Sequence, residues 1–182
     1  MSLCKNFMTR VTTSRAFILI AWTVFVSGFA GAAMSGEPTP EARLPNAWYP
    51  EPNRIASGAL DEETIGKLRK AGIKHVINLR TTQEMAGFDE AAALAAQGIT
   101  YSHLPITAET LDKEHARKLD ELLEQAGSEP TLVHCASGNR VGALIALRAA
   151  WIHGRPTEEA IEEGRRWGLA GLENKVRALL EQ

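Results

Sequence analysis

The 182-residue chain is poor in cysteine, in aromatic side chains and in clustered positive charge. It holds only two cysteines, Cys4 and Cys135, and 6% of its residues are aromatic. Its basic residues form no run and its aromatic residues no stripe, which argues against nucleic acid as a partner. The histidines other than His134 lack the spacing of metal ligands, so we expect no metal site and no cofactor.

The first acidic residue of the chain is Glu37, and the segment before it has a composition of its own. Three basic residues precede a largely apolar stretch over residues 16–26, and Ala30-Gly31-Ala32 then offers the small residues that a signal peptidase reads. The stretch is shorter than the about 20 residues of a membrane span. We therefore expect residues 1–32 to be the signal peptide of an exported, periplasmic protein, with an uncleaved N-terminal membrane anchor as the alternative.

Cleavage at this point would leave about 150 residues, enough for one domain with a sizeable core. Four prolines and few apolar residues mark residues 33–50 as a tether that leads into the domain, residues 51–182. Trp48 and Tyr49 are expected to pack the end of the tether on the domain or to rim a pocket. Without the three basic residues of the leader, 17 basic residues face 22 acidic ones, a net charge of −5. No stable membrane contact is expected after cleavage.

Strand-like and helix-like segments alternate along the rest of the chain, which predicts an α/β fold. Apolar positions recur at helical spacing in several segments that begin at an Asp or end at a Gly. The pattern predicts a central, mostly parallel sheet flanked by helices. The expected strands are residues 54–58, 75–79, 99–104 and 131–134, and the expected helices are residues 61–72, 88–97, 112–126, 141–153, 158–167 and 172–180.

The stretch TLVHCASGNRVG, residues 131–142, combines a buried strand, a short loop and the start of a helix. Gly138 allows backbone angles that other residues resist, and the N–H groups of such a loop form an anion cradle at the start of the helix. The same field favours the thiolate of Cys135, and the planar fork of Arg140 suits the oxygens of a phosphate-like group. A lone cysteine can equally be an inert, buried side chain. The loop spacing of Gly138 and Arg140 favours a functional thiol.

The order His134-Cys135, two residues, Gly138 and then Arg140 resembles the signature loop of cysteine-dependent phosphatases and of their rhodanese relatives. The flanking sequence, at residues 57–58, 73–80, 98–106 and 138–142, resembles the bacterial beta-lactamase-hydrolase-like phosphatase family. This resemblance extends from about residue 46 to the C-terminus. It implies a protein-tyrosine-phosphatase-like fold of the dual-specificity type, a phosphorylated substrate, and a role for His134 in ordering the loop by hydrogen bonding.

Two departures from the phosphatase pattern leave the reaction open. Only four residues, Ala136, Ser137, Gly138 and Asn139, separate the cysteine from the arginine, where phosphatases usually have five. Val141 stands where many of them carry Ser or Thr. The leading function is hydrolysis of phosphate esters through a cysteinyl-phosphate on Cys135, with the anion held by the loop amides and Arg140. Sulfur transfer from a sulfane-sulfur donor through a Cys135 persulfide is the alternative, and an inactive anion-binding module is the third possibility.

The sequence places no aspartate where dual-specificity phosphatases carry their general acid. That position is Ala108, so Glu109, one residue later, is the candidate substitute and Asp112 a weaker one. Both could equally be solvated residues before the next helix. Arg80 follows an expected strand and would either gather an anion or pair with a carboxylate such as Glu84. Ser137 and Asn139 are expected to face the cradle or its rim.

Overall fold

The computed structural model describes residues 43–182. The expected signal peptide, residues 1–32, and most of the expected tether lie outside the described residues. Within residues 43–182, none of the helices has the length and apolar character of a membrane span.

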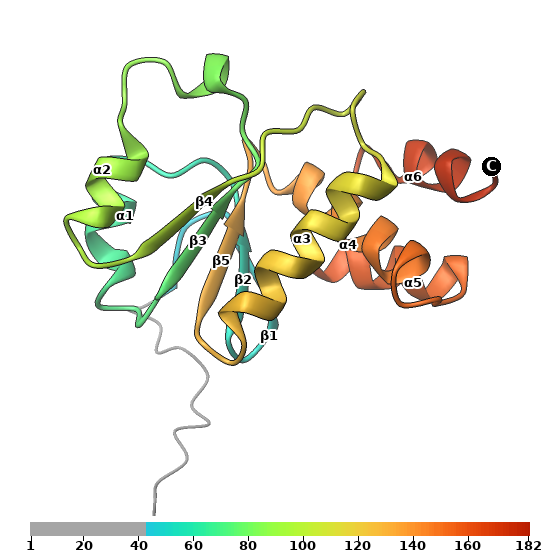
Figure 1. The fold of residues 1–182 in the computed structure, drawn as a ribbon, viewed down its shortest axis with the longest axis horizontal. Helices are drawn as coiled ribbons and strands as arrows, with labels where there is room; N and C mark the ends of the chain where they lie inside the picture. The colour runs from blue at the N-terminus through green and yellow to red at the C-terminus, as the bar shows by residue number, and fades with distance from the viewer. Residues whose placement is uncertain (1–42) are drawn as a thin grey trace, which may run out of the picture. The chain divides into compact units, whose positions relative to one another are not determined.

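Five strands form one sheet in the order β1-β2-β5-β3-β4 (Figure 1). Strands β2, β5, β3 and β4 run parallel to one another, and the edge strand β1 pairs with β2 in the antiparallel direction. The mostly parallel sheet confirms the predicted fold class. The strand bounds are Ala47–Glu51 (β1), Arg54–Ser57 (β2), His75–Asn78 (β3), Thr100–His103 (β4) and Thr131–His134 (β5).

Strand β1 begins within the segment that the sequence assigned to the tether. Trp48 on this strand pairs with Ala56 of β2, and Leu44 just before it is buried. Pro50, one of the four prolines that indicated a tether, is compatible with β1 because β1 is an edge strand, where a missing N–H removes no essential ladder bond. The folded domain thus includes residues that the sequence pattern assigned to the tether.

Helices fill the segments between the strands close to the expected positions. Asp61, Asp89 and Asp112 each accept a hydrogen bond from the backbone N–H three residues on, so these side chains cap three of the helices. A short 3₁₀ helix that the periodicity did not predict follows β3. The bounds are Glu62–Leu68 (α1), Thr82–Met85 (η2), Glu90–Ala95 (α2), Lys113–Ala126 (α3), Asn139–Trp151 (α4), Thr157–Arg166 (α5) and Glu173–Leu180 (α6).

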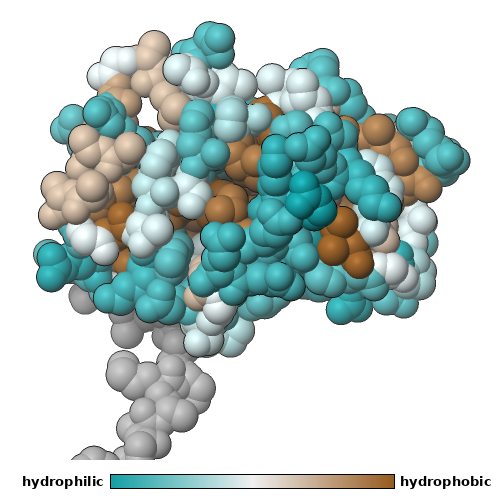
Figure 2. All heavy atoms as spheres, viewed as in Figure 1, coloured by the Kyte–Doolittle hydropathy of each residue, from teal (hydrophilic) through white to brown (hydrophobic). Residues whose placement is uncertain are grey.

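The two faces of the sheet are covered by different helices, α1 and α2 on one side and α3 to α6 on the other (Figure 1). Side chains of a strand alternate between the faces, so Val76 and Leu132 join one apolar cluster while Ile77 and Val133 join the other. Figure 2 shows that the side of α3 turned to the viewer is mostly hydrophilic. Its opposite side packs inward through Ala116, Leu119, Leu123 and Ala126.

Helix α4 is the most buried helix of the described chain, as the sequence predicts for a central helix. It packs directly against α5, where a Cβ added to Gly142 would lie 2.6 Å from the carbonyl oxygen of Gly164. Glycine at position 142 therefore lets the two helices approach within backbone contact. This packing holds the first turn of α4, and with it the loop that precedes the helix.

Candidate active site

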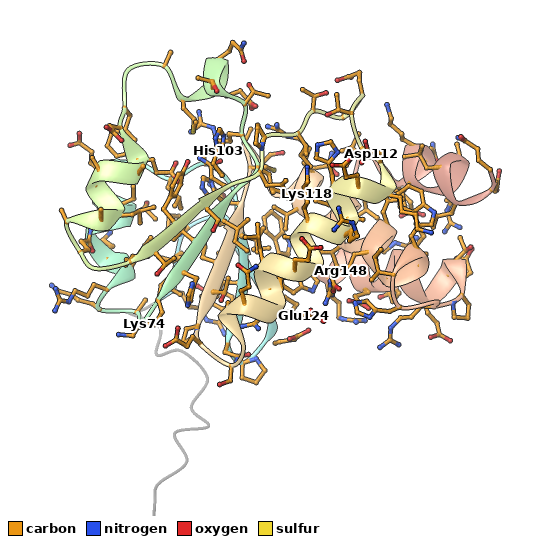
Figure 3. All side chains as sticks on the ribbon, in the orientation of Figure 1. Lys74, His103, Asp112, Lys118, Glu124 and Arg148 are labelled. Atoms are coloured by element: carbon orange, nitrogen blue, oxygen red, sulfur yellow. The ribbon has the colours of Figure 1, made fainter. Side chains whose placement is uncertain are left out.

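The Cys135–Arg140 loop lies at the edge of the sheet where the parallel strands end. Ser57, Asn78 and His134 are the last residues of β2, β3 and β5, and the register places Ser57 and Asn78 on either side of His134. Ligands of parallel sheets gather at this edge. Figure 3 shows the edge at His103, the last residue of β4, with Lys74 at the opposite end of the sheet.

Cys135 lies at the centre of the loop, fully buried, and its sulfur accepts a hydrogen bond. The Gly138 N–H donates to Cys135 Sγ over 3.1 Å, as expected for a cradle of backbone amides. Gly138 has φ of 82° and precedes α4 directly, so the positive end of the helix faces the sulfur. A Cβ at Gly138 would also overlap the ring of Trp48. Trp48 therefore packs against the loop from β1.

The rest of the loop is held by its neighbours. The Ala59 N–H donates to the carbonyl oxygen of Ala136 over 3.1 Å, and the Cys135 N–H donates to that of Ser57 over 3.4 Å. The Asn139 Oδ1 accepts from the Ala170 N–H at 2.9 Å, which ties the start of α4 to the segment before α6. Asn139 thus lines the pocket described below, while its side-chain oxygen is hydrogen-bonded to the backbone of Ala170. Ser137, in contrast, is exposed.

The guanidinium of Arg140 is held at one edge by a carboxylate that the sequence analysis assigned elsewhere. Arg140 Nη1 donates to Glu84 Oε2 over 2.9 Å and to the carbonyl oxygen of Ile106 over 2.6 Å, and Nη2 donates to Glu84 Oε1. The Glu84 hydrogen bond is the main cause of a raised pKa of Arg140, burial opposes it, and the charge of Cys135 adds to it. The bidentate pair fixes the plane of the fork beside the thiol.

Glu84 is ionised and firmly placed. Its hydrogen bond to Arg140 is the main reason that its pKa falls from the ordinary 4.5 to about 2. Its side chain also accepts from the Thr81 N–H over 2.8 Å, and the Glu84 N–H donates to Thr81 Oγ1 over 3.4 Å. This is the capping box of the 3₁₀ helix η2. The Thr-x-x-Glu spacing was a signal that the sequence analysis passed over.

Arg80 lies elsewhere than the anion cradle. Its guanidinium donates to the main-chain carbonyl of Glu84 rather than to that residue's carboxylate, so the expected Arg80–Glu84 ion pair does not form. The Arg80 side chain lines a neighbouring cavity of about 330 Å³. Its Nε is buried and has no hydrogen-bond partner.

An open pocket of about 520 Å³ leads down to the loop. Arg140 and Glu84 lie in its wall, and Cys135, five residues before Arg140 in the same loop, is buried. Of the residues expected from the sequence, Ala136, Ser137, Asn139 and Arg140 border it. The expected residues that do not border it are Arg80, Glu109, His134, Cys135 and Gly138. The residues around the pocket are Thr81, Glu84, Thr107, Ala108, Ala136, Ser137, Asn139, Arg140 and Leu172.

Glu109 has little in its surroundings that suits a general acid. Its side chain is exposed, and a hydrogen bond from Thr107 is the first cause of a lowered pKa. A general acid must instead keep its proton near neutral pH. Ala108, which does line the pocket, has no titratable group.

His134 turns its ring away from the solvent and toward a carboxylate on α2. Its Nε2 lies 2.8 Å from Glu90 Oε1, and both side chains are buried. The sequence analysis expected His134 to order the loop but did not identify Glu90, because the two residues lie 44 positions apart. Within residues 43–182, no three His, Cys, Asp or Glu side chains come together as a metal-ion site would require.

Comparison with solved structures finds phosphatases of this fold. A candidate phosphatase from Neisseria meningitidis is 26% identical with a TM-score of 0.62, over 74% of this chain and 96% of that one. A cysteine-to-serine variant of TpbA from Pseudomonas aeruginosa, in complex with phosphotyrosine, is 20% identical with a TM-score of 0.59, over 74% and 82%. A DUF442 candidate phosphatase from Shewanella putrefaciens is 23% identical with a TM-score of 0.57, over 71% and 83%.

No curated protein matches the chain. A family model, however, matches residues 52–152, more than half of the 182 residues, and this range contains every strand but β1 together with the whole Cys135–Arg140 loop. The chain therefore belongs to the family of the phosphatase-like domain of beta-lactamase hydrolase-like protein.

Proposed function

We propose that the protein hydrolyses phosphate monoesters through a covalent intermediate on Cys135. The observation that carries the proposal is the pairing around the sulfur. The Gly138 amide donates to Cys135 Sγ, and the guanidinium of Arg140, oriented by Glu84, also interacts with the thiol, whose charge contributes to the raised pKa of Arg140. Both groups stabilise the negative charge of a thiolate nucleophile and the negative charge that develops in the transition state of its attack on a phosphate. The membership of the phosphatase-like family supports the same reaction class.

The reaction has two displacements at phosphorus. The Cys135 thiolate attacks the phosphorus atom, the sulfur–phosphorus bond forms, and the bond to the ester oxygen breaks with its electron pair leaving on that oxygen. Water then attacks the cysteinyl-phosphate and releases inorganic phosphate and the thiolate. In both steps the loop N–H groups and the free edge of Arg140 hold the three equatorial oxygens.

The pocket limits which esters react quickly. A positioned acid contributes about 10²–10⁴-fold by protonating the departing oxygen. Ala108 stands at the position of that acid and Glu109 has a lowered pKa, so the leaving oxygen must depart largely unassisted. Phenolate-type leaving groups, which are stable as anions, are therefore favoured over alkoxides.

Sulfur transfer, which the four-residue loop suggested, gains no support from the family or from the solved structures of similar fold. Export rests only on the composition of residues 1–32, and we include it as a proposal. A phosphorylated compound outside the cytoplasm is then the expected substrate.

The test is hydrolysis of an aryl phosphate by the full chain beside its Cys135→Ser variant. We expect turnover that disappears with the thiol, and trapping of a phosphorylated Cys135 peptide by acid quench and mass spectrometry. Equal activity in both proteins would refute the covalent mechanism. Thiosulfate as a second substrate distinguishes the alternative, since cyanide-dependent thiocyanate formation without phosphate release would indicate a sulfurtransferase.

A further inference from the structure

A buried polar cluster lies directly behind the Cys135–Arg140 loop. It consists of Asn78 on β3, Glu90 on α2, Tyr101 on β4 and His134 on β5. Asn78, Glu90 and His134 are 0%, 2% and 0% exposed. A buried carboxylate is costly unless its oxygens are paired, and both Glu90 oxygens have partners here. We call these four residues the Glu90 cluster.

One side of the Glu90 cluster leads to the nucleophile. Glu90 Oε1 pairs with His134 Nε2 at 2.8 Å, and His134 is joined to Cys135 by a peptide bond. A carboxylate only accepts, so Nε2 carries the hydrogen, and Nδ1, which is buried, has no partner. Glu90 is thus the only side-chain partner that orients this ring within the described residues.

The other side of the Glu90 cluster leads to the arginine. Glu90 Oε2 accepts from Asn78 Nδ2 over 3.2 Å, and Asn78 Oδ1 accepts from the Arg80 N–H over 2.7 Å. The next residue is Thr81, which caps η2 and places Glu84 against Arg140. Three acceptors around Nδ2 (Met85 Sδ, Glu90 Oε2 and the Tyr101 hydroxyl) and one donor to Oδ1, the Arg80 N–H, therefore set the orientation of the Asn78 amide.

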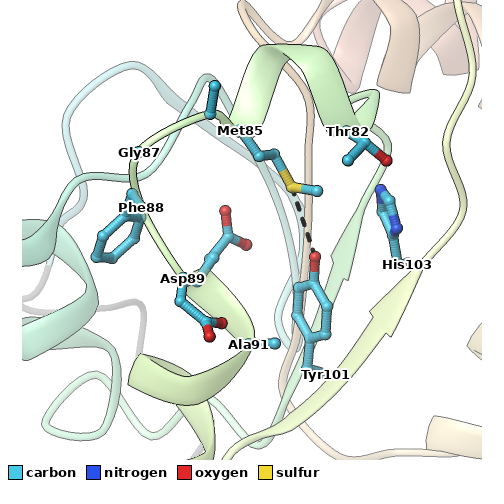
Figure 4. A pocket seen from close by; sticks show the side chains of 10 residues that line it. Thr82, Met85, Gly87, Phe88, Asp89, Ala91, Tyr101 and His103 are labelled. Atoms are coloured by element: carbon cyan, nitrogen blue, oxygen red, sulfur yellow. Dashed lines mark hydrogen bonds between the residues drawn. The ribbon is translucent and has the colours of Figure 1, made fainter.

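The Tyr101 hydroxyl completes the cluster from β4. It accepts from Asn78 Nδ2 over 3.1 Å, and it lies 3.7 Å from the Met85 sulfur at the end of η2. Figure 4 shows this hydroxyl pointing to Met85 across a pocket of about 570 Å³, with His103 beside the ring. Four separate elements thus meet at one set of hydrogen bonds.

We propose that Glu90 is a positioning residue that holds Cys135 and Arg140 in register through two opposite hydrogen-bond chains. The inference rests on the proposed phosphatase function and extends it to a residue that touches no substrate. Because one chain reaches Cys135 through His134 and the other reaches the Arg140 guanidinium through Asn78 and Glu84, loosening Glu90 shifts the thiol relative to the guanidinium. A displacement of about 1 Å in a catalytic site costs roughly 10²-fold in rate.

Glu90→Gln keeps the shape of the side chain but forces a conflict. The introduced amide has one accepting and one donating end, whereas His134 Nε2 and Asn78 Nδ2 both donate to Glu90. One of the two chains must break unless the His134 ring moves its hydrogen from Nε2 to Nδ1, which would leave a buried Nδ1–H without an acceptor. We expect kcat for an aryl phosphate to fall by about 10²-fold while KM changes by less than about threefold, the signature of a loss confined to the transition state.

A second substitution tests the hydrogen-bond logic. Asn78→Asp combined with Glu90→Gln exchanges the donor and the acceptor, so that the amide at position 90 donates to the carboxylate at position 78. That carboxylate still accepts from the Arg80 N–H and accepts from the Tyr101 hydroxyl, which rotates to donate, whereas Met85 Sδ loses the donor that it has in Asn78. We expect the double variant to recover kcat to within about tenfold of the unsubstituted protein, which additive damage would not do.

Asp120→Asn is the matched control. Asp120 is another buried carboxylate, 8% exposed, that pairs with Arg148 at 2.7 Å and with His153 at 3.0 Å. None of these three residues lines the catalytic pocket. We expect this variant to lose stability in urea unfolding and to keep kcat. Equal losses of kcat in both single variants, or a Glu90→Gln protein with unchanged kcat, would overturn the positioning role.

The reactivity of the thiol separates this inference from the proposed function. Alkylation of Cys135 by iodoacetamide, followed on its peptide by mass spectrometry, needs no turnover. If the unsubstituted protein hydrolyses nothing, the proposed function fails. The positioning of Cys135 is still supported if Glu90→Gln alone changes the alkylation rate more than about tenfold. Identical alkylation rates in all variants would refute the positioning role. If Glu90→Gln proves too unstable for kinetics, the double variant is compared with the unsubstituted protein instead.

Discussion

The ion pair between Glu84 and Arg140 gives the most quantitative prediction. Glu84→Gln preserves the shape of the side chain and removes the charge that holds the guanidinium. The fall in the pKa of Glu84 from 4.5 to about 2 corresponds to an upper limit of about 3 kcal/mol. The side chain of Glu84 is 30% exposed and that of Arg140 13%, so solvent screening reduces this figure. We expect a loss of about 1–2 kcal/mol in the free energy of unfolding at pH 7.

The pH dependence of that loss tests its origin. The pKa of Glu84 is lower in the folded chain than in the unfolded chain, so the stabilisation is fully present above about pH 4.5 and disappears as the pH falls toward 2. Urea unfolding of the two proteins should therefore give curves whose difference shrinks between these pH values. A difference that stays constant down to pH 2 would refute an electrostatic cause.

A matched control separates this pair from a surface ion pair. Glu63 and Lys67 also form a carboxylate–cation pair, but their side chains are 79% and 55% exposed. Glu63→Gln should change the free energy of unfolding by less than about 0.5 kcal/mol at any pH. Glu84→Gln should in addition lower kcat/KM for an aryl phosphate, because Arg140 loses the partner that sets its plane, whereas Glu63→Gln should leave kcat/KM unchanged.

Two further predictions concern the pocket and the helix packing. Ala108→Asp places a carboxyl group in the pocket wall. We expect the rate of alkyl phosphate hydrolysis to rise by about 10-fold or more, which is part of the 10²–10⁴-fold that a positioned acid supplies. An equal rise for aryl and alkyl esters would exclude acid catalysis. Gly142→Ala adds a Cβ that would lie 2.6 Å from the Gly164 carbonyl oxygen, and we expect it to destabilise the fold by about 1–3 kcal/mol in urea unfolding. Gly66→Ala, where a Cβ meets nothing within 4 Å, is its control and should be neutral or stabilising.

The parts of the fold that local patterns specify were predictable from the sequence. Asp61, Asp89 and Asp112 mark helix starts because their side chains bond to the backbone three residues on, an interaction that needs no tertiary contact. The runs around Val76 and Leu132 predict buried parallel strands because both faces of such a sheet are covered. Strand β1 was not predicted because local patterns do not specify it. Its proline-containing stretch becomes a strand only by pairing with β2.

The α/β order of the chain and the short loop between Cys135 and Arg140 can be read from the sequence, because both depend on residues that are close neighbours. Which charges complete the site depends on the folded arrangement. Glu84 lies 56 positions from Arg140 and Glu90 lies 44 positions from His134, so neither pairing leaves a periodic or spacing signal. The folded sheet brings the ends of β3 and β5 together, and the carboxylates that follow β3 then meet the loop that follows β5. A contact of that kind depends on strand register, which long-range packing sets.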